Sequence, residues 1–237
     1  MNDQSVSPPA ALSIEVVSDV VCPWCYVGKR RLEGALALYA KARPDAPAPT
    51  VAWLPFQLNP QLPAEGMARA DYVAAKWGGR SSADVYARVS AVGETVGIAF
   101  RFDRIVRQPN TLAAHSLIEL AGAHGVQSEV KEALLAAYFL DGRDLTDAQT
   151  LVDVVAAAGL DAVVARAHLA DPAARHAVEA GDVEARQLGV QGVPFFIFNR
   201  RYAVSGAEES AMLLQAMLES EAPAPVAHDA AAERIGG

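Results

Sequence analysis

The sequence predicts an α/β fold in which a large all-helical domain is inserted between a β-α-β half and a β-β-α half. Short apolar runs typical of buried strands stand near both ends of the chain, whereas the long middle repeats apolar residues at the spacing of helices. Prolines and glycines separate these segments, as they do in loops. The boundaries that we expect are 13–66 for the first half, 67–188 for the helical insertion and 189–220 for the second half.

The first half reads as strand, helix and strand. Residues 13–18 predict a buried strand, and residues 23–42 predict a helix because apolar residues recur on it at helical spacing. Three prolines within residues 43–49 end this helix. Residues 50–56 then predict the second strand.

The insertion reads as a series of helices. Residues 114–121 and 130–138 each carry an apolar stripe at helical spacing. Thr146 followed by Gln149 has the spacing of a capping box and predicts the start of another helix, which Gly159 would end. We expect no strand in this part of the chain.

The second half reads as a hairpin followed by a helix. Residues 194–198 and 202–204 predict two strands, joined by a tight turn at 199–200. Residues 205–208 have capping-box spacing and predict the start of the last helix. The final stretch, 221–237, is rich in Ala and Pro and predicts a disordered tail.

The chain holds two cysteines among its 237 residues, and they stand close together as Cys22-Pro23-Trp24-Cys25. This motif follows the first predicted strand and opens the first predicted helix. A helix N-terminus carries partial positive charge and unpaired N–H groups, which favour a thiolate and make the first cysteine reactive. A Cys-x-x-Cys motif beside a strand and a helix is a thioredoxin-like redox signal. The two outer pieces together therefore predict one thioredoxin fold.

Three other interpretations of the cysteine pair stay open. A structural disulfide that closes so short a loop would stabilise the fold little. A structural zinc site needs four ligands, so two histidines would have to complete a site that the two cysteines begin. The histidines lack the His-x3-5-His spacing of such sites. They are His115, His124, His168, His176 and His228. The third interpretation is two inert buried thiols. The sequence therefore favours the redox pair and no metal.

Composition and charge narrow the function classes. The chain is 52% hydrophobic and 20% charged, as in ordinary globular proteins. Its net charge of −8 argues against nucleic acid as a main partner. No apolar run approaches a membrane span, and residues 1–12 do not resemble a signal peptide. We therefore expect a cytoplasmic protein with no membrane partner, in which disulfides are usually transient and catalytic.

A proline loop is expected to face the thiols. Pro194 stands just before a predicted strand, where a missing N–H is tolerated. Although cis bonds are uncommon even before proline, the cysteine motif upstream favours a cis Val193–Pro194 bond. The Val193 backbone would then face the Cys22 sulfur and pair with an extended substrate. Val193 and Pro194 are therefore candidate substrate-binding residues.

These motifs resemble the DsbA family of thiol–disulfide oxidoreductases, in its FrnE-like branch. The resemblance runs from about residue 13 to 218, and is most specific in the segments 18–28, 189–198 and 202–207, with support from 110–117. It implies a thioredoxin fold with an inserted helical domain, and an oxidoreductase or isomerase. It also implies a redox-active disulfide and no bound cofactor.

The resemblance and the motif together assign roles to the cysteines. Cys22 attacks a substrate disulfide and forms a mixed disulfide, which Cys25 resolves. Pro23 suits the first helical turn, and the pair Pro23 and Trp24 are candidate substrate contacts. The alternative for Trp24, which we expect to be exposed, is packing on the loop. Tyr26 and Gly28 are expected to be packing and turn residues.

Three further residues are candidates near the thiols. Glu15 is unusual in an apolar strand, and Asp19 lies close to Cys22 in sequence. Because a buried charge is rare unless it is paired or functional, either carboxylate is a candidate proton relay for Cys25. Glu15 has the alternative of facing solvent or a basic residue. His115, on an inserted helix, is a candidate cleft residue, with a partly buried helix histidine as the alternative.

The leading function is a protein thiol–disulfide oxidoreductase or isomerase, which acts on protein or small thiol and disulfide substrates. A second is a glutathione-dependent isomerase or kappa-type glutathione transferase, which shares the fold and acts on a small aromatic compound. In those relatives a serine commonly stands where Cys22 stands here, but glutathione could also be an exchange partner of the leading function. A third is a redox-sensing or chaperone-like binding module. The sequence does not set the oligomeric state.

Overall fold

The computed structural model describes residues 11–77 and 83–221. Its first half contains β1 (Ser13–Ser18), α1 (Pro23–Ala42) and β2 (Thr50–Pro55), as the sequence predicts. Pro23 has a backbone φ preset for the first helical position, and α1 ends shortly before Pro44 because the residue before a proline disfavours helical geometry. β1 and β2 pair in parallel, so the connection between them crosses over through α1.

The second half contributes β5 (Phe195–Phe198), β6 (Tyr202–Ser205) and α9 (Ser210–Glu221). Asn199 and Arg200 both have positive φ, at 50° and 54°, which is the geometry of a tight hairpin turn that matches strand twist. The predicted hairpin is therefore confirmed. β5 pairs antiparallel with both β6 and β1, and the sheet order is β2-β1-β5-β6. Both halves of the chain thus build one mixed sheet.

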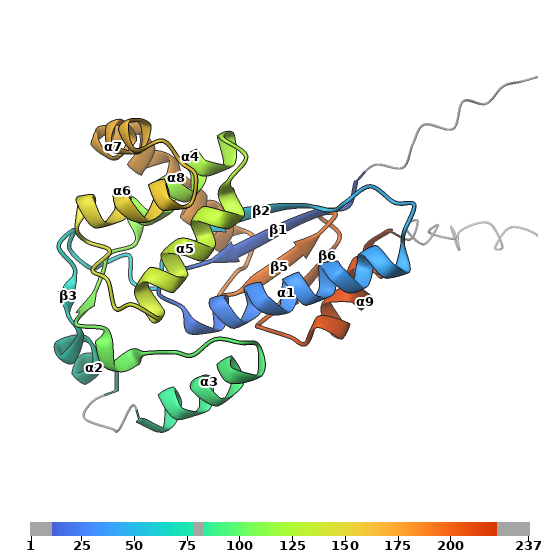
Figure 1. Cartoon of the computed structure of the whole chain (residues 1–237), viewed down its shortest axis with the longest axis horizontal. Helices are drawn as coiled ribbons and strands as arrows, with labels where there is room; N and C mark the ends of the chain where they lie inside the picture. Colours follow the sequence, from blue (N-terminus) through green and yellow to red (C-terminus); the bar gives the residue numbers. More distant parts are fainter. Residues whose placement is uncertain (1–10, 78–82, 222–237) are drawn as a thin grey trace, which may run out of the picture.

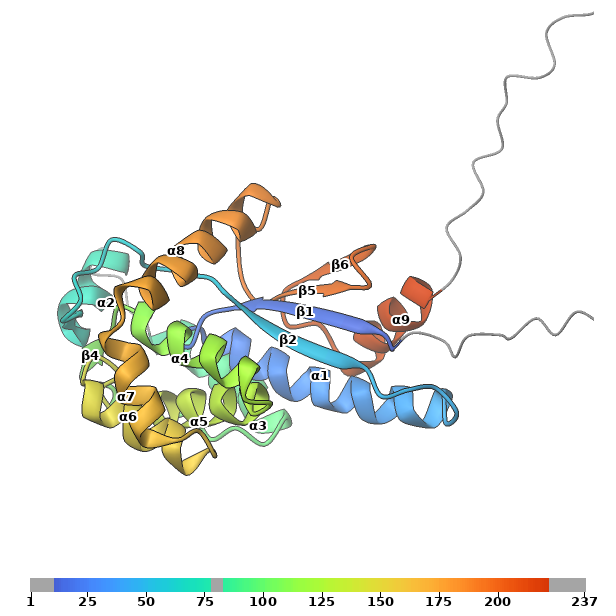
Figure 2. The ribbon, with the colours of Figure 1, turned by 90° about the horizontal axis from the view of Figure 1, so that it is seen from above.

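Helices cover the two faces of this sheet differently. α1 and α9 lie together on one face, and α8 (Pro172–Gln187) lies on the other (Figure 2). Alternate side chains of each strand point to opposite faces, so Phe196 and Phe198 join the core beneath α1. Val17 belongs to the smaller cluster on the α8 face. The apolar core beneath α1 continues into the helical insertion without a break.

The insertion gathers at the end of the sheet where α1 begins (Figure 1). It is not entirely helical, because two short strands pair antiparallel and place Met67 opposite Gln108. Strands of two residues have no measurable apolar alternation, so the sequence pattern could not indicate them. In chain order the elements before α8 are β3 (Met67–Ala68), α2 (Arg69–Trp77), α3 (Ala83–Thr95), the 3-10 helix η1 (Phe102–Arg104), β4 (Arg107–Gln108), α4 (Leu112–Ala123), α5 (Gln127–Phe139), α6 (Ala148–Ala157) and α7 (Ala162–Ala170).

Two predicted helix starts are wrong in detail. α6 is capped by Asp147, whose carboxylate accepts from the Thr150 N–H, while the Thr146 hydroxyl donates to Asp144 instead. Ser205 ends β6, and α9 begins only at Ser210. A capping-box spacing does not show which neighbouring polar residue takes the cap. Glu221, predicted to open the tail, belongs to α9, and the rest of the predicted tail lies outside the described residues.

A charged cluster fastens the insertion to α1. The Tyr26 hydroxyl donates to Glu132 Oε1 at 2.7 Å. Lys29 Nζ lies 2.9 Å from Glu132 Oε2, and Arg30 donates to the same carboxylate. Lys29 also pairs with Glu33 one turn along the helix. Glu132 of α5 thus holds the first turns of α1 through three side chains.

We expect Glu132→Ala to lower the free energy of unfolding by about 1–3 kcal/mol, because it leaves the buried Lys29 ammonium with one carboxylate instead of two. Urea denaturation measures the loss. Glu129→Ala, at an exposed position of the same helix, is the matched control and should cost no more than about 0.5 kcal/mol. Equal losses of unfolding free energy in the two variants would show that Glu132 does not fasten α5 to α1.

Candidate redox active site

The two cysteines lie at the N-terminus of α1. Cys22 is the N-cap residue, and the Cys25 N–H donates to the Cys22 carbonyl at 3.0 Å. Both cysteines are free thiols and both are buried, with Cys22 5% exposed and Cys25 1%. Cys22 is thus the nearer of the two to solvent. The arrangement gives one thiol at the helix end and a second thiol one turn behind it.

The proline loop faces Cys22. The Val193–Pro194 peptide bond is cis, as the sequence predicts, and the Cys22 thiol donates to the Val193 carbonyl across 3.5 Å. The Pro194 carbonyl accepts from the Gly206 N–H at 2.9 Å, which ties the loop to the end of β6. The second half of the chain therefore presents a backbone segment directly opposite the attacking sulfur.

Gly28 makes this close approach possible. A Cβ on Gly28 would lie 2.8 Å from Pro194 Cγ and 3.2 Å from Phe196, which is closer than packed carbon atoms come. Gly28 was expected to be a turn residue, but it lies inside α1. Glycine is normally unfavourable in a helix, so its cost here is offset by the contact with the proline loop.

The pKa values of the two thiols are shifted in opposite directions. The hydrogen bond from Cys25, assisted by the backbone N–H groups of Trp24 and Cys25, lowers the pKa of Cys22 although burial opposes it. Burial raises the pKa of Cys25 well above its ordinary value, and the neighbouring Cys22 adds to the rise. A proton leaves Cys22 first and stays on Cys25. Cys22 is therefore the nucleophile that the geometry favours.

Asp19 and His115 form a buried pair beside the thiols. Asp19 is fixed close to Cys22, because the Cys22 N–H donates to its carbonyl at 3.3 Å. Its carboxylate accepts from the Leu58 N–H at 2.8 Å and lies 3.3 Å from His115 Nε2. Burial would raise the pKa of Asp19, but these hydrogen bonds outweigh it and lower that pKa. Since the carboxylate only accepts, His115 donates through Nε2.

Burial lowers the pKa of His115 in spite of the nearby carboxylate. His115 is almost fully buried, so it matches the alternative of a buried helix histidine and does not line an open cleft. The structure thus brings Asp19 and His115 together, which neither residue's local sequence indicates.

Lys131 is the charged residue of this region that the sequence reasoning missed. It comes from α5, is fully buried, and interacts electrostatically with Cys25, Asp19 and Cys22. Burial lowers the pKa of Lys131 to about 8. A signal was present in the sequence: Lys131 is in helical register with Leu135 and Tyr138, both of them buried. A lysine in an apolar stripe is rare unless it has a partner.

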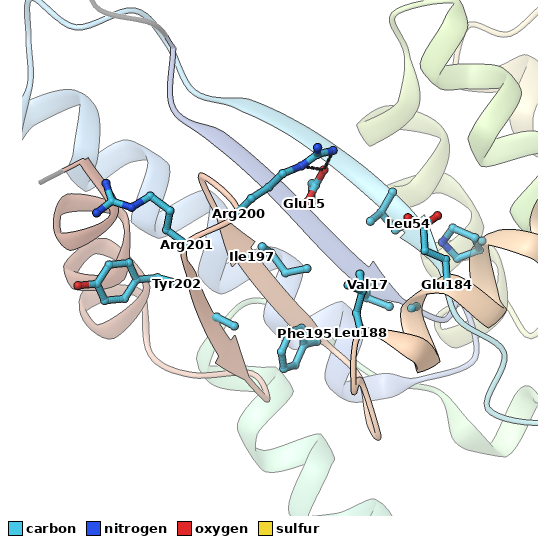
Figure 3. Close-up of a pocket in the computed structure, with 14 residues that line it drawn as sticks. Glu15, Val17, Leu54, Glu184, Leu188, Phe195, Ile197, Arg200, Arg201 and Tyr202 are labelled. Carbon is cyan, nitrogen blue, oxygen red and sulfur yellow. Dashed lines mark hydrogen bonds and ion pairs between the residues drawn. The ribbon is translucent and has the colours of Figure 1, made fainter. Parts of the chain in front are cut away.

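Glu15 lies away from the thiols and pairs with a basic residue, which is the alternative that the sequence left open beside a proton relay. Its side chain points to the face of the sheet that α8 covers, and Arg200 donates to its carboxylate from Nε at 3.1 Å and Nη2 at 2.8 Å (Figure 3). A pocket of about 520 Å³ lies there, with Val17 and Ile197 in its lining. Adjacent strand residues alternate between faces, so Glu15 is directed away from the α1 face.

The remaining candidates lie around the thiols in different ways. Pro23 occupies the first turn of α1, and Trp24, which we expected to be exposed, is half-buried against the main core. Val193 packs on the smaller cluster. Across residues 11–77 and 83–221, no three His, Cys, Asp or Glu side chains gather as metal ligands. In the same ranges no helix has both the length and the apolar character to cross a membrane.

The fold and the site define a thioredoxin-fold protein with a Cys-x-x-Cys dithiol opposite a cis-proline loop. The family model of the DSBA-like thioredoxin domain matches residues 13–218. The chain therefore belongs to the DsbA-like family. The match spans the helical insertion as well as both halves of the sheet. The finer assignment to the FrnE-like branch stays a prediction.

The chain is similar to several individual proteins. SCO1869 of Streptomyces coelicolor, a probable DsbA oxidoreductase, is 36% identical, with 88% of this chain and 89% of that chain covered and a TM-score of 0.78. The uncharacterized protein YwbO of Bacillus subtilis is 24% identical, over 78% of this chain and 85% of its own length. A 2-hydroxychromene-2-carboxylate isomerase has a TM-score of 0.63 at 17% identity, with 87% and 95% covered. It shares the fold.

We expect Gly28→Ala to destabilise the protein and displace the proline loop, because overpacking costs about 1–3 kcal/mol and exceeds the gain of about 0.5–1 kcal/mol from removing a helical glycine. Thermal unfolding measures the first effect and Cys22 alkylation the second. Gly122→Ala in α4 is the control, since its Cβ would meet only the flexible Gln127 side chain, at 3.1 Å. A neutral or stabilising Gly28→Ala would contradict the role of this contact.

We expect Cys25→Ala to raise the pKa of Cys22, because it removes the hydrogen bond that contributes most to the low value. At pH values below the pKa, each unit of rise lowers the thiolate fraction about tenfold. Iodoacetamide alkylation against pH measures it. Cys25→Ser keeps a hydroxyl donor and should shift the pKa of Cys22 less. Superimposable profiles of the two variants would exclude the hydrogen bond as the cause.

Proposed function

We propose that this protein is a thiol–disulfide oxidoreductase or isomerase that acts on protein disulfides through Cys22 and Cys25. The observation that supports this most is the placement of both thiols at one helix end opposite the cis Val193–Pro194 loop, with the Cys22 thiol 3.5 Å from the Val193 carbonyl. The surroundings lower the pKa of Cys22 and raise that of Cys25, in keeping with this placement. Two inert buried thiols would need no such difference.

The reaction follows from these acidities. The Cys22 thiolate attacks one sulfur of a substrate disulfide, forms a mixed disulfide and releases the other sulfur as a thiolate. Cys25 then loses its proton and attacks Cys22 Sγ, so that the Cys22–Cys25 bond forms as the bond to the substrate breaks. The substrate gains two electrons and the cysteine pair loses two. The reverse sequence oxidises a substrate dithiol.

The proline loop supports an extended protein substrate. The Val193 carbonyl faces the attacking sulfur, where a substrate strand can pair with the loop backbone and place its disulfide at Cys22. Pro23 and Trp24 border the same position and would contact the substrate. The reaction needs no bound cofactor, and glutathione or another small thiol can restore the pair by exchange. The compartment that we propose is the cytoplasm, where a cysteine pair is usually catalytic.

We expect the Cys22–Cys25 pair to undergo a two-electron transition in glutathione buffers, measured by mass spectrometry of the trapped protein. A potential near about −270 mV, like thioredoxin, would indicate a reductase, and one near about −120 mV, like DsbA, an oxidase or isomerase. Cys22→Ser should abolish turnover of a disulfide substrate.

Accumulation of a Cys22–glutathione adduct with no internal disulfide would overturn this proposal. It would favour a glutathione-dependent isomerase or transferase, whose activity should also survive Cys25→Ala. A redox-sensing or chaperone-like module would instead form the disulfide and change its binding on oxidation, with no turnover of disulfide substrates.

A further inference from the structure

Lys131 is a buried cation with an unusual environment. It is 0% exposed, and no hydrogen-bond acceptor in the described residues reaches its Nζ. The ammonium lies 5.7 Å from the centre of the Trp53 ring, an attraction that compensates only part of the desolvation. A buried charge is normally paired or functional, because its transfer out of water costs several kcal/mol. Lys131 therefore needs a partner that a plain core position does not supply.

Lys29 shows how a buried lysine of this protein is normally paired with carboxylates. It is also buried, at 5% exposure, but its ammonium pairs with Glu33 and with Glu132, the neighbour of Lys131 on α5. The described part of the chain thus offers a carboxylate in this region, and Glu132 turns toward α1 and binds Tyr26 and Lys29. Lys131 instead interacts electrostatically with the groups of the redox site.

The negative groups that face Lys131 are those of the redox site. Its favourable electrostatic interactions are with Cys25, then Asp19, then Cys22, and Lys29 of α1 opposes them. His115 of α4 is paired with Asp19, and the positive charge of Lys131 helps to lower the pKa of His115. The Asp19 carboxylate disfavours a thiolate at Cys22, whereas Lys131 favours one at Cys25. The helical insertion thus contributes a charge to the dithiol.

We propose, on the basis of the proposed function, that Lys131 is a positioning residue for the second half of the reaction, where its buried ammonium stabilises the Cys25 thiolate that resolves the mixed disulfide. In the mixed disulfide Cys22 carries no charge, so Lys131 and Asp19 set the charge around Cys25. Cys25 loses its proton, its sulfur bonds to Cys22 Sγ, and the Cys22–substrate bond breaks. The electron pair of that bond leaves with the substrate sulfur, which takes up one proton.

Reaction with 5,5′-dithiobis(2-nitrobenzoate) separates the two steps. Attack by Cys22 releases one coloured thiolate and forms the mixed disulfide, and attack by Cys25 then releases the second. Stopped-flow absorbance records both phases between pH 6 and pH 10. We expect Lys131→Met to slow the second phase at pH 7 by about tenfold or more, since a nearby opposite charge lowers a thiol pKa by about 1–3 units.

The pH profile distinguishes charge from packing. The deficit of Lys131→Met should shrink as the pH rises above about 8, because the Lys131 ammonium of the wild-type protein then loses its proton and no longer stabilises the thiolate. Lys131→Arg, which keeps the charge, should restore the second phase. Lys29→Met is the matched control, a buried lysine whose charge is already paired, and should leave the second phase within about twofold of wild type. Lys131→Gln replaces Lys131→Met should the latter not fold.

Each outcome has one meaning. A second phase in Lys131→Met or Lys131→Gln that matches wild type, or a deficit equal at all pH values, overturns the role of Lys131 and leaves the proposed function intact. If the wild-type protein releases only one thiolate and forms no internal disulfide, the proposed function itself is overturned. A second phase slowed equally by Lys29→Met would overturn the special position of Lys131.

Discussion

Because Gly28 has no side chain, Pro194 can rest against the first turns of α1, and Cys22 meets the Val193 carbonyl only because the two segments come this close. The cysteines come from one end of the sequence and the proline loop from the other, so the site exists only when both halves pair in one sheet. The β1–β5 pairing provides this, since it carries the chain from the proline loop directly alongside the strand that precedes the cysteines.

Local patterns predicted the parts of this structure that local physics decides. β1, α1 and the hairpin at Asn199 follow from apolar spacing, a proline at a helix start and turn residues. The spacing of the cysteine pair alone predicts a redox site. The sequence could not predict which face of the sheet the Glu15 side chain lies on, because this depends on which face α1 covers. Gly28 was given the wrong role, because its contact with the proline loop joins segments over 100 residues apart and no local period reports it. Lys131 was missed although its place in the apolar stripe of α5 was a local signal.

The helical insertion takes part in the site and does more than cover it. One helix, α5, sends Glu132 to hold the first turns of α1 and sends the next residue back in the chain, Lys131, toward the thiols. α4 supplies His115 to Asp19. The shared apolar core keeps these helices in place. Movement of the insertion relative to the sheet would therefore change the charges at the cysteines as well as access to them.

The buried charges explain how two chemically identical thiols take different roles. Position at the helix end alone would acidify Cys22, yet it leaves Cys25 protonated at the moment when it must attack. The Asp19 carboxylate does not stabilise a thiolate by its charge, since a second negative charge nearby is unfavourable. The buried ammonium of Lys131, brought in by α5, favours a thiolate at Cys25 and resolves the conflict. On this view the insertion supplies that charge, which links the fold to the chemistry.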